Sequence, residues 1–323
     1  MSSDPFFRLD EDIERQRADT WRPLKDHESR DEERIQPHCL RIDPGGVVRV
    51  GLSTTPRAWF ERLSLFGEVL HLTRNPIAVL GKLGPVPKLN NWLNPVTPSD
   101  LHNTYTPNLA EYATLWAVRE ASLAGVLHGL EARNVSGTIF ERVLLPAGVN
   151  RDFFEQFVLA HQSTPEEGRP WYSPNHAWAK RQRDRLASRI PWLRARWEAG
   201  FTHVRLLPPE FPVRLLEAAG RSGFQLRLAH YSPALVRAVH WTPRLREEPA
   251  TGCMEFFHGD DVGFHLSTKG VASAWLWTGQ CACCGEDRWS VELADRSDQL
   301  GVAMMAGSGG QEPEWRRLIG ECL

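Results

Sequence analysis

The sequence predicts an α+β protein of two tandem homologous repeats, each a mostly antiparallel β-sheet flanked by helices. Two observations predict this fold. The C-terminal part reads as four strands followed by a helix, and elements of the same kind and order occur about half a chain earlier. The offset of roughly 160 residues is much longer than the 20–50-residue unit of a solenoid, so it indicates a duplicated domain. A chain of 323 residues can supply two domains with a core each.

The C-terminal unit carries the clearest pattern. Trp289, Val291 and Leu293 alternate with polar or small residues, which is typical of a strand with one buried face. Pro313 stands near the start of the closing helix, where its missing N–H costs nothing. The strands and the helix of this unit are predicted within residues 263–277, 289–295, 300–305 and 312–319.

The first copy of the unit lies in the N-terminal half. Residues 105–116 match 264–275 in length, 128–134 and 139–145 match the strands between 289 and 305, and 150–158 match the closing helix. Ahead of this copy, residues 47–51 and 67–75 read as strands, and Thr55 is predicted to cap a helix that begins at Pro56. In the second half, residues 213–219 read as a helix ended by Gly220, and residues 224–230 and 236–240 read as strands.

The predicted organisation has four parts. They are a charged N-terminal arm at 1–36, a first repeat at 37–163, a linker with a basic helix at 164–205, and a second repeat at 206–323. The net charge of −2 gives no electrostatic reason to expect binding to nucleic acid or to an anionic membrane surface. No apolar run approaches a membrane span, and no secretory signal is recognised, so a cytoplasmic protein is expected.

A family resemblance begins at Gly67-Glu-Val-Leu-His-Leu-Thr-Arg-Asn75, with Ala78-Val79 and Gly84 behind it. The second half agrees through Gly252-Cys253, Phe264-His-Leu266, Val271-Ala-Ser-Ala-Trp275, Ser290-Val-Glu-Leu293 and Glu312-Pro-Glu-Trp315. In this order the motifs resemble those of the cytoplasmic haemin-transport and haemin-degrading proteins of bacterial haem-uptake systems. The resemblance implies two tandem homologous halves and a haem bound at their junction.

The resemblance also implies an axial histidine near the start of a helix after the linker. Here the corresponding place holds residues 184–192, which contain no histidine, and other haem-contacting stations differ at 278–281 and 304–308. Histidines elsewhere could bind the iron, and arginines could pair with the haem propionates. An ordinary structural role is the alternative for each residue. The candidate haem-binding residues are His176, His203, His230, His240, His265, Arg74, Arg181 and Arg183.

A cysteine-rich loop offers different chemistry. Cys281, Cys283 and Cys284 lie close together in the sequence, with Cys253 and His258 on a preceding strand. Thiolates and imidazole are ligands that zinc prefers, so these five residues are a candidate metal site. Structural cysteines and a redox-active pair are the open alternatives.

Two functions remain at this point. The first is a cytoplasmic haem-binding protein in haem trafficking, utilisation or degradation, with a haem transporter or a haem oxygenase as partner. Any haem breakdown would need an external electron donor, because the sequence shows no nucleotide- or flavin-binding fingerprint. The alternative is a divergent member that binds no haem and acts as a metal-binding or protein-interaction module.

Overall fold

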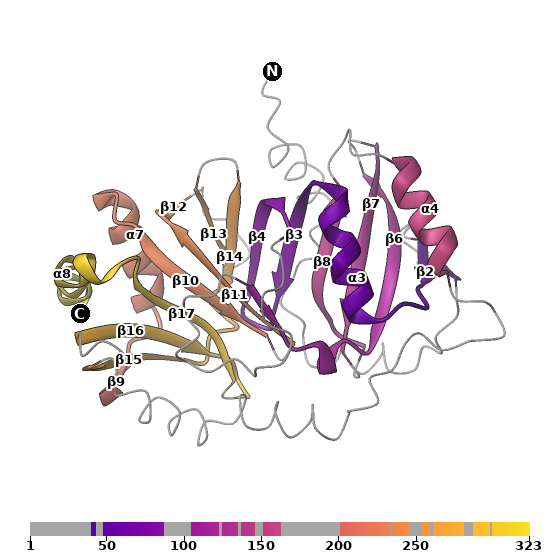
Figure 1. Ribbon diagram of the computed structural model, residues 1–323. Coiled ribbons are helices and arrows are strands. Elements are labelled where there is room, and N and C mark those ends of the chain that lie inside the picture. The colour runs from indigo at the N-terminus through magenta and orange to yellow at the C-terminus, as the bar shows by residue number, and fades with distance from the viewer. Residues whose placement is uncertain are drawn as a thin grey trace.

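The computed structural model describes residues 40–42, 48–86, 105–122, 125–134, 137–145, 151–162, 201–232, 234–245, 253–258, 261–280, 287–297 and 299–323. Within these ranges the helices are α3 (Pro56–Leu63), α4 (Arg151–His161), α7 (Phe211–Ser222) and α8 (Glu312–Cys322). Short 3-10 turns are η1 (Ser64–Phe66), η3 (Leu109–Glu111) and η4 (Gly309–Gln311). Figure 1 shows α3 and α4 on one half of the molecule and α7 and α8 on the other.

The strands form two antiparallel sheets. The strands that come from the first half of the chain are β1 (Leu40–Ile42), β2 (Val48–Gly51), β3 (Glu68–Arg74), β4 (Ala78–Pro85), β5 (Tyr105–Pro107), β6 (Thr114–Ser122), β7 (Gly125–Arg133) and β8 (Ile139–Leu145). Those from the second half are β9 (Phe201–Leu207), β10 (Leu226–Tyr231), β11 (Leu235–Trp241), β12 (Arg244–Leu245), β13 (Cys253–His258), β14 (Val262–Ser267), β15 (Ser273–Gln280), β16 (Asp287–Ala294) and β17 (Leu300–Ala306). The orders are β1-β2-β6-β7-β8-β3-β4-β14-β13-β12 and β5-β11-β10-β17-β16-β15-β9.

The two sheets repeat one topology. The run β2-β6-β7-β8-β3-β4 in the first sheet has the same connections as β9-β15-β16-β17-β10-β11 in the second. A side-chain detail repeats as well: the Trp116 indole Nε1 donates to Thr114 Oγ1 at 3.0 Å, and the Trp275 Nε1 donates to Ser273 Oγ at 2.9 Å. The two tryptophans are 159 positions apart. The predicted fold of two tandem α+β repeats is confirmed.

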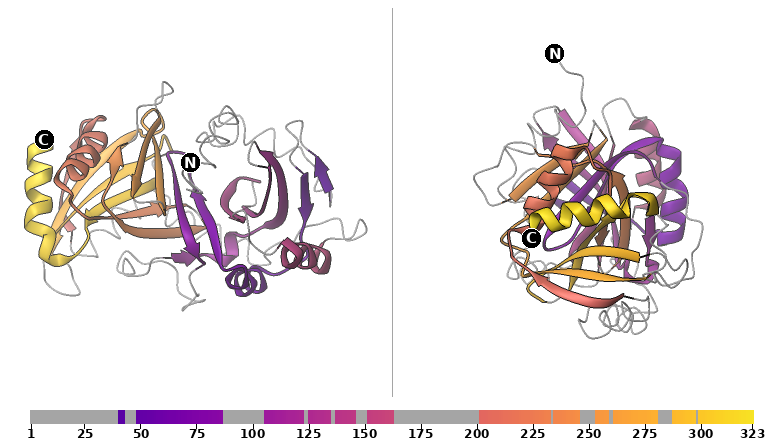
Figure 2. Two further views of the ribbon diagram at one scale, coloured as in Figure 1. Left: turned by 90° about the horizontal axis from the view of Figure 1, so that it is seen from above. Right: turned by 90° about the vertical axis from the view of Figure 1, so that its left-hand side faces the viewer.

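Each sheet is completed by strands from the other half. The first-half strand β5 pairs with β11, so that Tyr105 lies opposite Arg237 in the second sheet. In return, the second-half strand β14 pairs with β4, and Phe264 lies opposite Leu80 in the first sheet. Figure 2 shows strands of the two halves side by side at the centre of the molecule. The repeats are therefore interlocked through backbone hydrogen bonds.

Each sheet packs one face against its own helices. In the first half, Trp59 and Phe60 of α3 and Phe154 of α4 belong to one buried apolar cluster with the sheet. In the second half, α7 and α8 cover a cluster that also includes Ala78 and Leu80 of β4, from the first repeat. The apolar cluster under α7 and α8 thus extends across the exchanged strands into β4.

A buried polar cluster lies where the halves meet. The Glu141 carboxylate accepts hydrogen bonds from the hydroxyls of Tyr105 and Tyr112, the latter at 2.7 Å, and contacts His71 Nε2. Arg237, from the second half, donates to the backbone carbonyl of His71 at 2.6 Å. Burial, together with nearby Arg237, lowers the pKa of His71 to about 4 although Glu141 opposes the shift. His71 is therefore neutral at pH 7, and its backbone carbonyl links the halves through Arg237.

The helix α7 departs from the sequence prediction at its end. The prediction stopped the helix at Gly220, whereas α7 continues to Ser222 and ends at Gly223, which has the left-handed φ of 70°. Gly220 instead permits close packing, since a Cβ atom there would lie 2.3 Å from the Pro243 carbonyl oxygen. The sequence thus held two candidate stop glycines, and the second is the helix terminator.

Replacing Gly220 by alanine tests this packing. We expect Gly220→Ala to lower the free energy of unfolding by about 1–3 kcal/mol, because the new methyl group meets backbone that has to move. Gly320→Ala in α8 is the matched control: a Cβ there meets nothing within 4 Å, so helix propensity should leave stability unchanged or slightly higher. Urea unfolding of both variants measures the difference, and equal midpoints would contradict the packing role of Gly220.

Candidate ligand-binding site

The side of the second sheet opposite α7 and α8 carries an unusual surface, which we term the far face. Strand alternation places Arg227, Ala229 and Tyr231 of β10 on it, because Leu226 and Leu228 point into the helix-covered core. The registers of neighbouring strands then arrange the far face into rows that run across the sheet.

Two adjacent rows differ sharply in chemistry. Three alanines, Ala238, Ala229 and Ala303, lie side by side on β11, β10 and β17. Neighbouring strands are about 4.8 Å apart, so these alanines form a flat apolar strip about 10 Å wide. The next row holds polar and large side chains, in the order His240, Arg227, Met305, Ser290 and Trp277.

Arg227 is unusual in this row because its charged side chain is buried. Its side chain belongs to a residue that is 5% exposed, and its Nε and Nη2 atoms have no hydrogen-bond partner in the described structure. Burial lowers the pKa of the Arg227 guanidinium, an effect that nearby Tyr231 opposes. A buried guanidinium without an acceptor is costly, and a carboxylate bound in a forked geometry would remove that cost.

Two other residues of the row, Trp277 and His240, add a hydrogen-bond donor and a candidate metal ligand. The indole Nε1 of buried Trp277 also lacks a partner in the described structure. His240 is directly opposite Arg227 on β11, and its pKa is lowered by partial burial and by the charges of Arg227 and Lys82. At pH 7 the imidazole of His240 is therefore neutral and able to donate an electron pair to a metal.

The first sheet provides an internal comparison, because each far-face position has an equivalent there. The row His240–Arg227–Met305 corresponds to Leu83–Leu70–Leu144, and Ala238–Ala229–Ala303 corresponds to Gly81–Leu72–Arg142. Leucines thus stand where the second sheet has its polar row. A leucine and an arginine fill positions where the second sheet has alanine. The far face of the first sheet carries larger side chains at these positions, and that of the second carries alanines beside a polar row.

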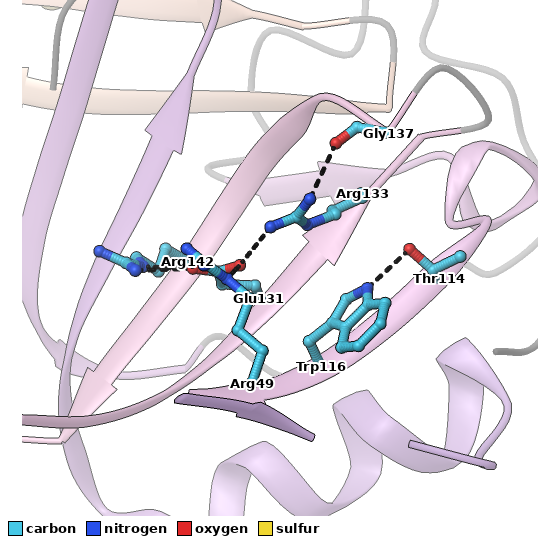
Figure 3. Close-up of polar contacts among 7 residues, drawn as sticks. All are labelled: Arg49, Thr114, Trp116, Glu131, Arg133, Gly137 and Arg142. Atoms are coloured by element: carbon cyan, nitrogen blue, oxygen red, sulfur yellow. Dashed lines mark hydrogen bonds and ion pairs between the residues drawn. The ribbon is translucent and has the colours of Figure 1, made fainter. Parts of the chain in front are cut away.

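An ion cluster fills much of the first far face (Figure 3). Glu131, fully buried, accepts from Arg142 Nη2 at 2.6 Å, from Arg49 Nε at 3.0 Å and from Arg133 Nη2 at 3.2 Å. Desolvation would raise the pKa of Glu131, but the charges of Arg142, Arg49 and Arg133 outweigh it and hold the pKa well below its usual range. In the second sheet the equivalent glutamate, Glu292, lies opposite Ala303 in place of an arginine.

Comparison with known proteins gives the fold a precedent. No family model and no curated protein matches the sequence. Among solved structures, the crystal structure of ChuS, an E. coli heme oxygenase, matches with a TM-score of 0.65 and 13% identity, covering 85% of this chain and 89% of that chain. Holo-PhuS, a heme-binding protein from Pseudomonas aeruginosa, matches with a TM-score of 0.63 and 17% identity, covering 84% and 86%. The chain has the fold of ChuS and PhuS.

This shared fold confirms the architecture implied by the motif order, which starts at Gly67 and ends near Trp315. At such low identity it establishes the fold alone, so the site has to be argued from this chain's own residues. No helix in the described part of the chain is long and apolar enough to cross a membrane.

Within the ChuS–PhuS fold of this chain, the predicted histidines separate by face. His240 lies on the far face. His230 points to the helix-covered side, is fully buried, and lies 3.1 Å from the Ala78 carbonyl oxygen through its Nε2; burial lowers its pKa to about 4. His203 is exposed on β9 and on the side opposite its neighbour Val204, which shares the far-face row of Trp277. His176 lies outside the described residues.

The remaining predicted residues lie elsewhere. His265 Nδ1 on β14 lies 3.3 Å from Glu255 Oε1 on β13 of the first sheet. Arg74 ends β3 and is 9% exposed. Arg181 and Arg183 lie outside the described residues.

The predicted metal site finds no support among the described residues, where no three His, Cys, Asp or Glu side chains could hold an ion together. His258 Nδ1 lies 3.1 Å from the Thr242 carbonyl oxygen. Cys253 begins β13. Cys281, Cys283 and Cys284 lie outside the described residues. The described residues therefore give no support for zinc.

Sequence reasoning missed Arg227, Met305 and the three alanines. The signal was present in the repeat itself, since β3 and β4 correspond to β10 and β11 at an offset of 157 positions, as Leu70 and Arg227 show. Aligning the halves over these strands would have revealed an arginine in place of a leucine.

The Glu131 cluster yields a stability prediction. Glu131→Gln leaves three buried arginines without their shared carboxylate, so we expect a loss of about 3–5 kcal/mol at pH 7. The pKa of Glu131 is depressed in the folded state, so its stabilisation is present above pH 4.5 and is lost as the pH falls below that value. The difference between wild type and variant should shrink accordingly in urea unfolding at decreasing pH.

The control for this prediction is Glu155→Gln. Glu155 pairs with Arg119 on the surface, where both side chains are about half exposed, so its loss should change stability by about 0–1 kcal/mol. A Glu131→Gln variant as stable as this control would show that the cluster is not a stabilising ion network.

Proposed function

We propose that this chain is a cytoplasmic haem-binding protein and that haem lies against the far face of the second sheet. The observation that carries the proposal is Arg227, a buried guanidinium beside a flat apolar strip, whose Nε and Nη2 atoms have no partner in the described part of the chain. Haem combines a flat apolar ring with carboxylates at its edge, which is the combination that this surface complements. The fold shared with ChuS, a heme oxygenase, and PhuS, a heme-binding protein, supports the same reading.

The roles of individual residues follow from the rows. Ala229, Ala238 and Ala303 present small side chains to the porphyrin plane, and Arg227 receives a propionate. The buried Trp277 adds an apolar indole to the same row, and its N–H has no partner within the described residues. Packing of the ring against these small and apolar side chains would contribute to affinity, while Arg227 would fix orientation.

The iron needs an axial donor, and alanine cannot supply one. Of the four candidate histidines in the described residues, His240 shares the far face with Arg227. His230 and His203 point to the other side of the sheet, and His265 lies on β14 of the first sheet. His240 is therefore the donor we propose, and its lowered pKa keeps the required neutral form. His176, outside the described residues, is the second candidate.

The cellular role proposed here is haem trafficking and utilisation, with delivery to or receipt from a haem transporter or a haem oxygenase. Haem breakdown by this chain would require an external electron donor. The haem-free alternative, a metal-binding or protein-interaction module, is favoured by no observation in the described residues.

Removing the Arg227 guanidinium tests the proposal. Arg227→Ala should weaken haem binding by about 2–5 kcal/mol, because the propionate then enters a buried site without its counter-charge. Arg227→Lys keeps the charge but loses the forked geometry, so its haem affinity should lie between those of wild type and Arg227→Ala. Arg221→Ala, an exposed arginine on α7 on the other side of the sheet, is the matched control and should bind as wild type does. Absorbance titration with haem measures each affinity.

A ligand-side change sharpens the same test. Haem dimethyl ester lacks the carboxylate charges, so wild type should bind it less tightly than haem, and Arg227→Ala should lose or reverse this preference. This coupling isolates the Arg227–carboxylate contact from general losses of structure. Equal preference in wild type and Arg227→Ala would contradict the role of Arg227.

Replacing the histidines tests the iron donor. His240→Ala should shift and broaden the Soret band of the haem complex, because the iron loses a strong donor. His203→Ala, on the opposite side of the sheet, should leave the band unchanged. A band that is unaffected in His240→Ala and altered in His176→Ala would transfer the donor role to His176.

A further inference from the structure

Asn75, directly after β3, joins the first half to the far face of the second. Its Nδ2 donates to the backbone carbonyls of Tyr231 at 2.7 Å and Gly301 at 2.8 Å. Its Oδ1 accepts from the backbone N–H groups of Ile77 at 2.9 Å and Ala78 at 2.8 Å. One side chain thus holds a turn of the first repeat and two strand ends of the second.

The hydrogen-bonding capacity of Asn75 is fully used. A primary amide has two N–H donors and an oxygen with two lone pairs, and all four find backbone partners here. The residue is 7% exposed, so water does not compete for these contacts. Aspartate has the same shape but would set an oxygen against two carbonyl oxygens, which makes Asn75 chemically specific.

Gly301 is the complement of this contact. A Cβ atom at Gly301 would lie 2.5 Å from Ile77 Cδ1 and Cγ1 and 3.2 Å from Asn75 Nδ2. The turn that follows β3 therefore presses directly on the backbone of β17. The absence of a side chain at Gly301 is what allows this approach.

The strand ends held by Asn75 are those of the alanine strip. Tyr231 follows Ala229 two positions along β10, and Gly301 precedes Ala303 two positions along β17. Alternation places Tyr231 on the far face beside the alanines, whereas Gly301 lies at an irregularity in the β16–β17 pairing, where a Cβ would point toward Ile77 of the helix-covered cluster. Asn75 therefore holds the backbone at the ends of β10 and β17, the strands that carry Ala229 and Ala303 of the proposed ligand site.

We propose that Asn75 is a positioning residue for the ligand site: through Tyr231 and Gly301 it makes the far face of the second half depend on the first half. This inference rests on the proposed haem-binding function. The first repeat would then contribute, through Asn75, to a ligand site that lies on the second repeat.

The test is Asn75→Asp in the full-length protein. The two carbonyls lose their donors and face a carboxylate, so the ends of β10 and β17 should shift. We expect haem affinity to fall on the order of tenfold, measured at 25 °C under conditions where the variant is fully folded by circular dichroism. Gly301→Ala disturbs the same contact from the other side and should weaken binding similarly, and the double variant should be little worse than either single one.

The matched control is Asn134→Asp. Asn134 also accepts a backbone N–H through its Oδ1, from Thr138 at 3.0 Å, but it lies in the β7–β8 turn of the first half. This variant should keep the wild-type haem affinity whatever its melting temperature. A role limited to stability would lower the melting temperature of Asn75→Asp and leave its haem affinity equal to that of the control.

The outcomes separate the two proposals. If wild type binds haem and both Asn75→Asp and Gly301→Ala bind it equally well, the inference is wrong and the proposed function stands. If wild type fails to bind haem, the proposed function is wrong and the inference falls with it. If only Gly301→Ala folds, its affinity alone decides the question, since it acts on the same contact.

Discussion

The pairing of β4 with β14, and of β5 with β11, is the constraint on which the rest of this structure depends. These pairings make each sheet a joint product of both repeats. They bring the turn after β3 against the ends of β10 and β17, and they place Tyr105 and Arg237 around the buried Glu141 cluster. The backbone exchange thus explains why polar contacts between the halves are buried and directional, whereas two domains joined only by a linker share a wetter interface.

Duplication followed by divergence gives the two far faces opposite characters. The first has an ion network around Glu131 and a row of leucines, which make it part of the folded interior. The second has alanines and an arginine without a described partner. Because strand order and register are the same in both, these differences come from side chains alone. The two copies have therefore diverged in chemistry with no change of topology, and the ligand site that we propose belongs to the second copy.

Much of the fold followed from local patterns, and the site did not. The alternation around Trp289 and the repeated order of elements were sufficient for the strands and the duplication. The exchange was not predictable, because β5 is three residues long from Tyr105 and its partner is distant in sequence. The role of Gly220 was predicted wrongly because a glycine is needed there for close packing against Pro243, which is not visible in the local sequence. Arg227 looked like an ordinary polar residue of an alternating strand until its burial was known.

The exchange also has a consequence for biosynthesis. As the ribosome extends the chain, β4 emerges with one edge lacking its final neighbour, and β14 follows about 180 residues later. At 5–20 residues per second, this interval lasts roughly ten to forty seconds. Throughout it, a nascent chain displays an apolar strand whose N–H and C=O groups can recruit other chains. Interlocked repeats therefore increase the need for chaperones to protect the growing polypeptide.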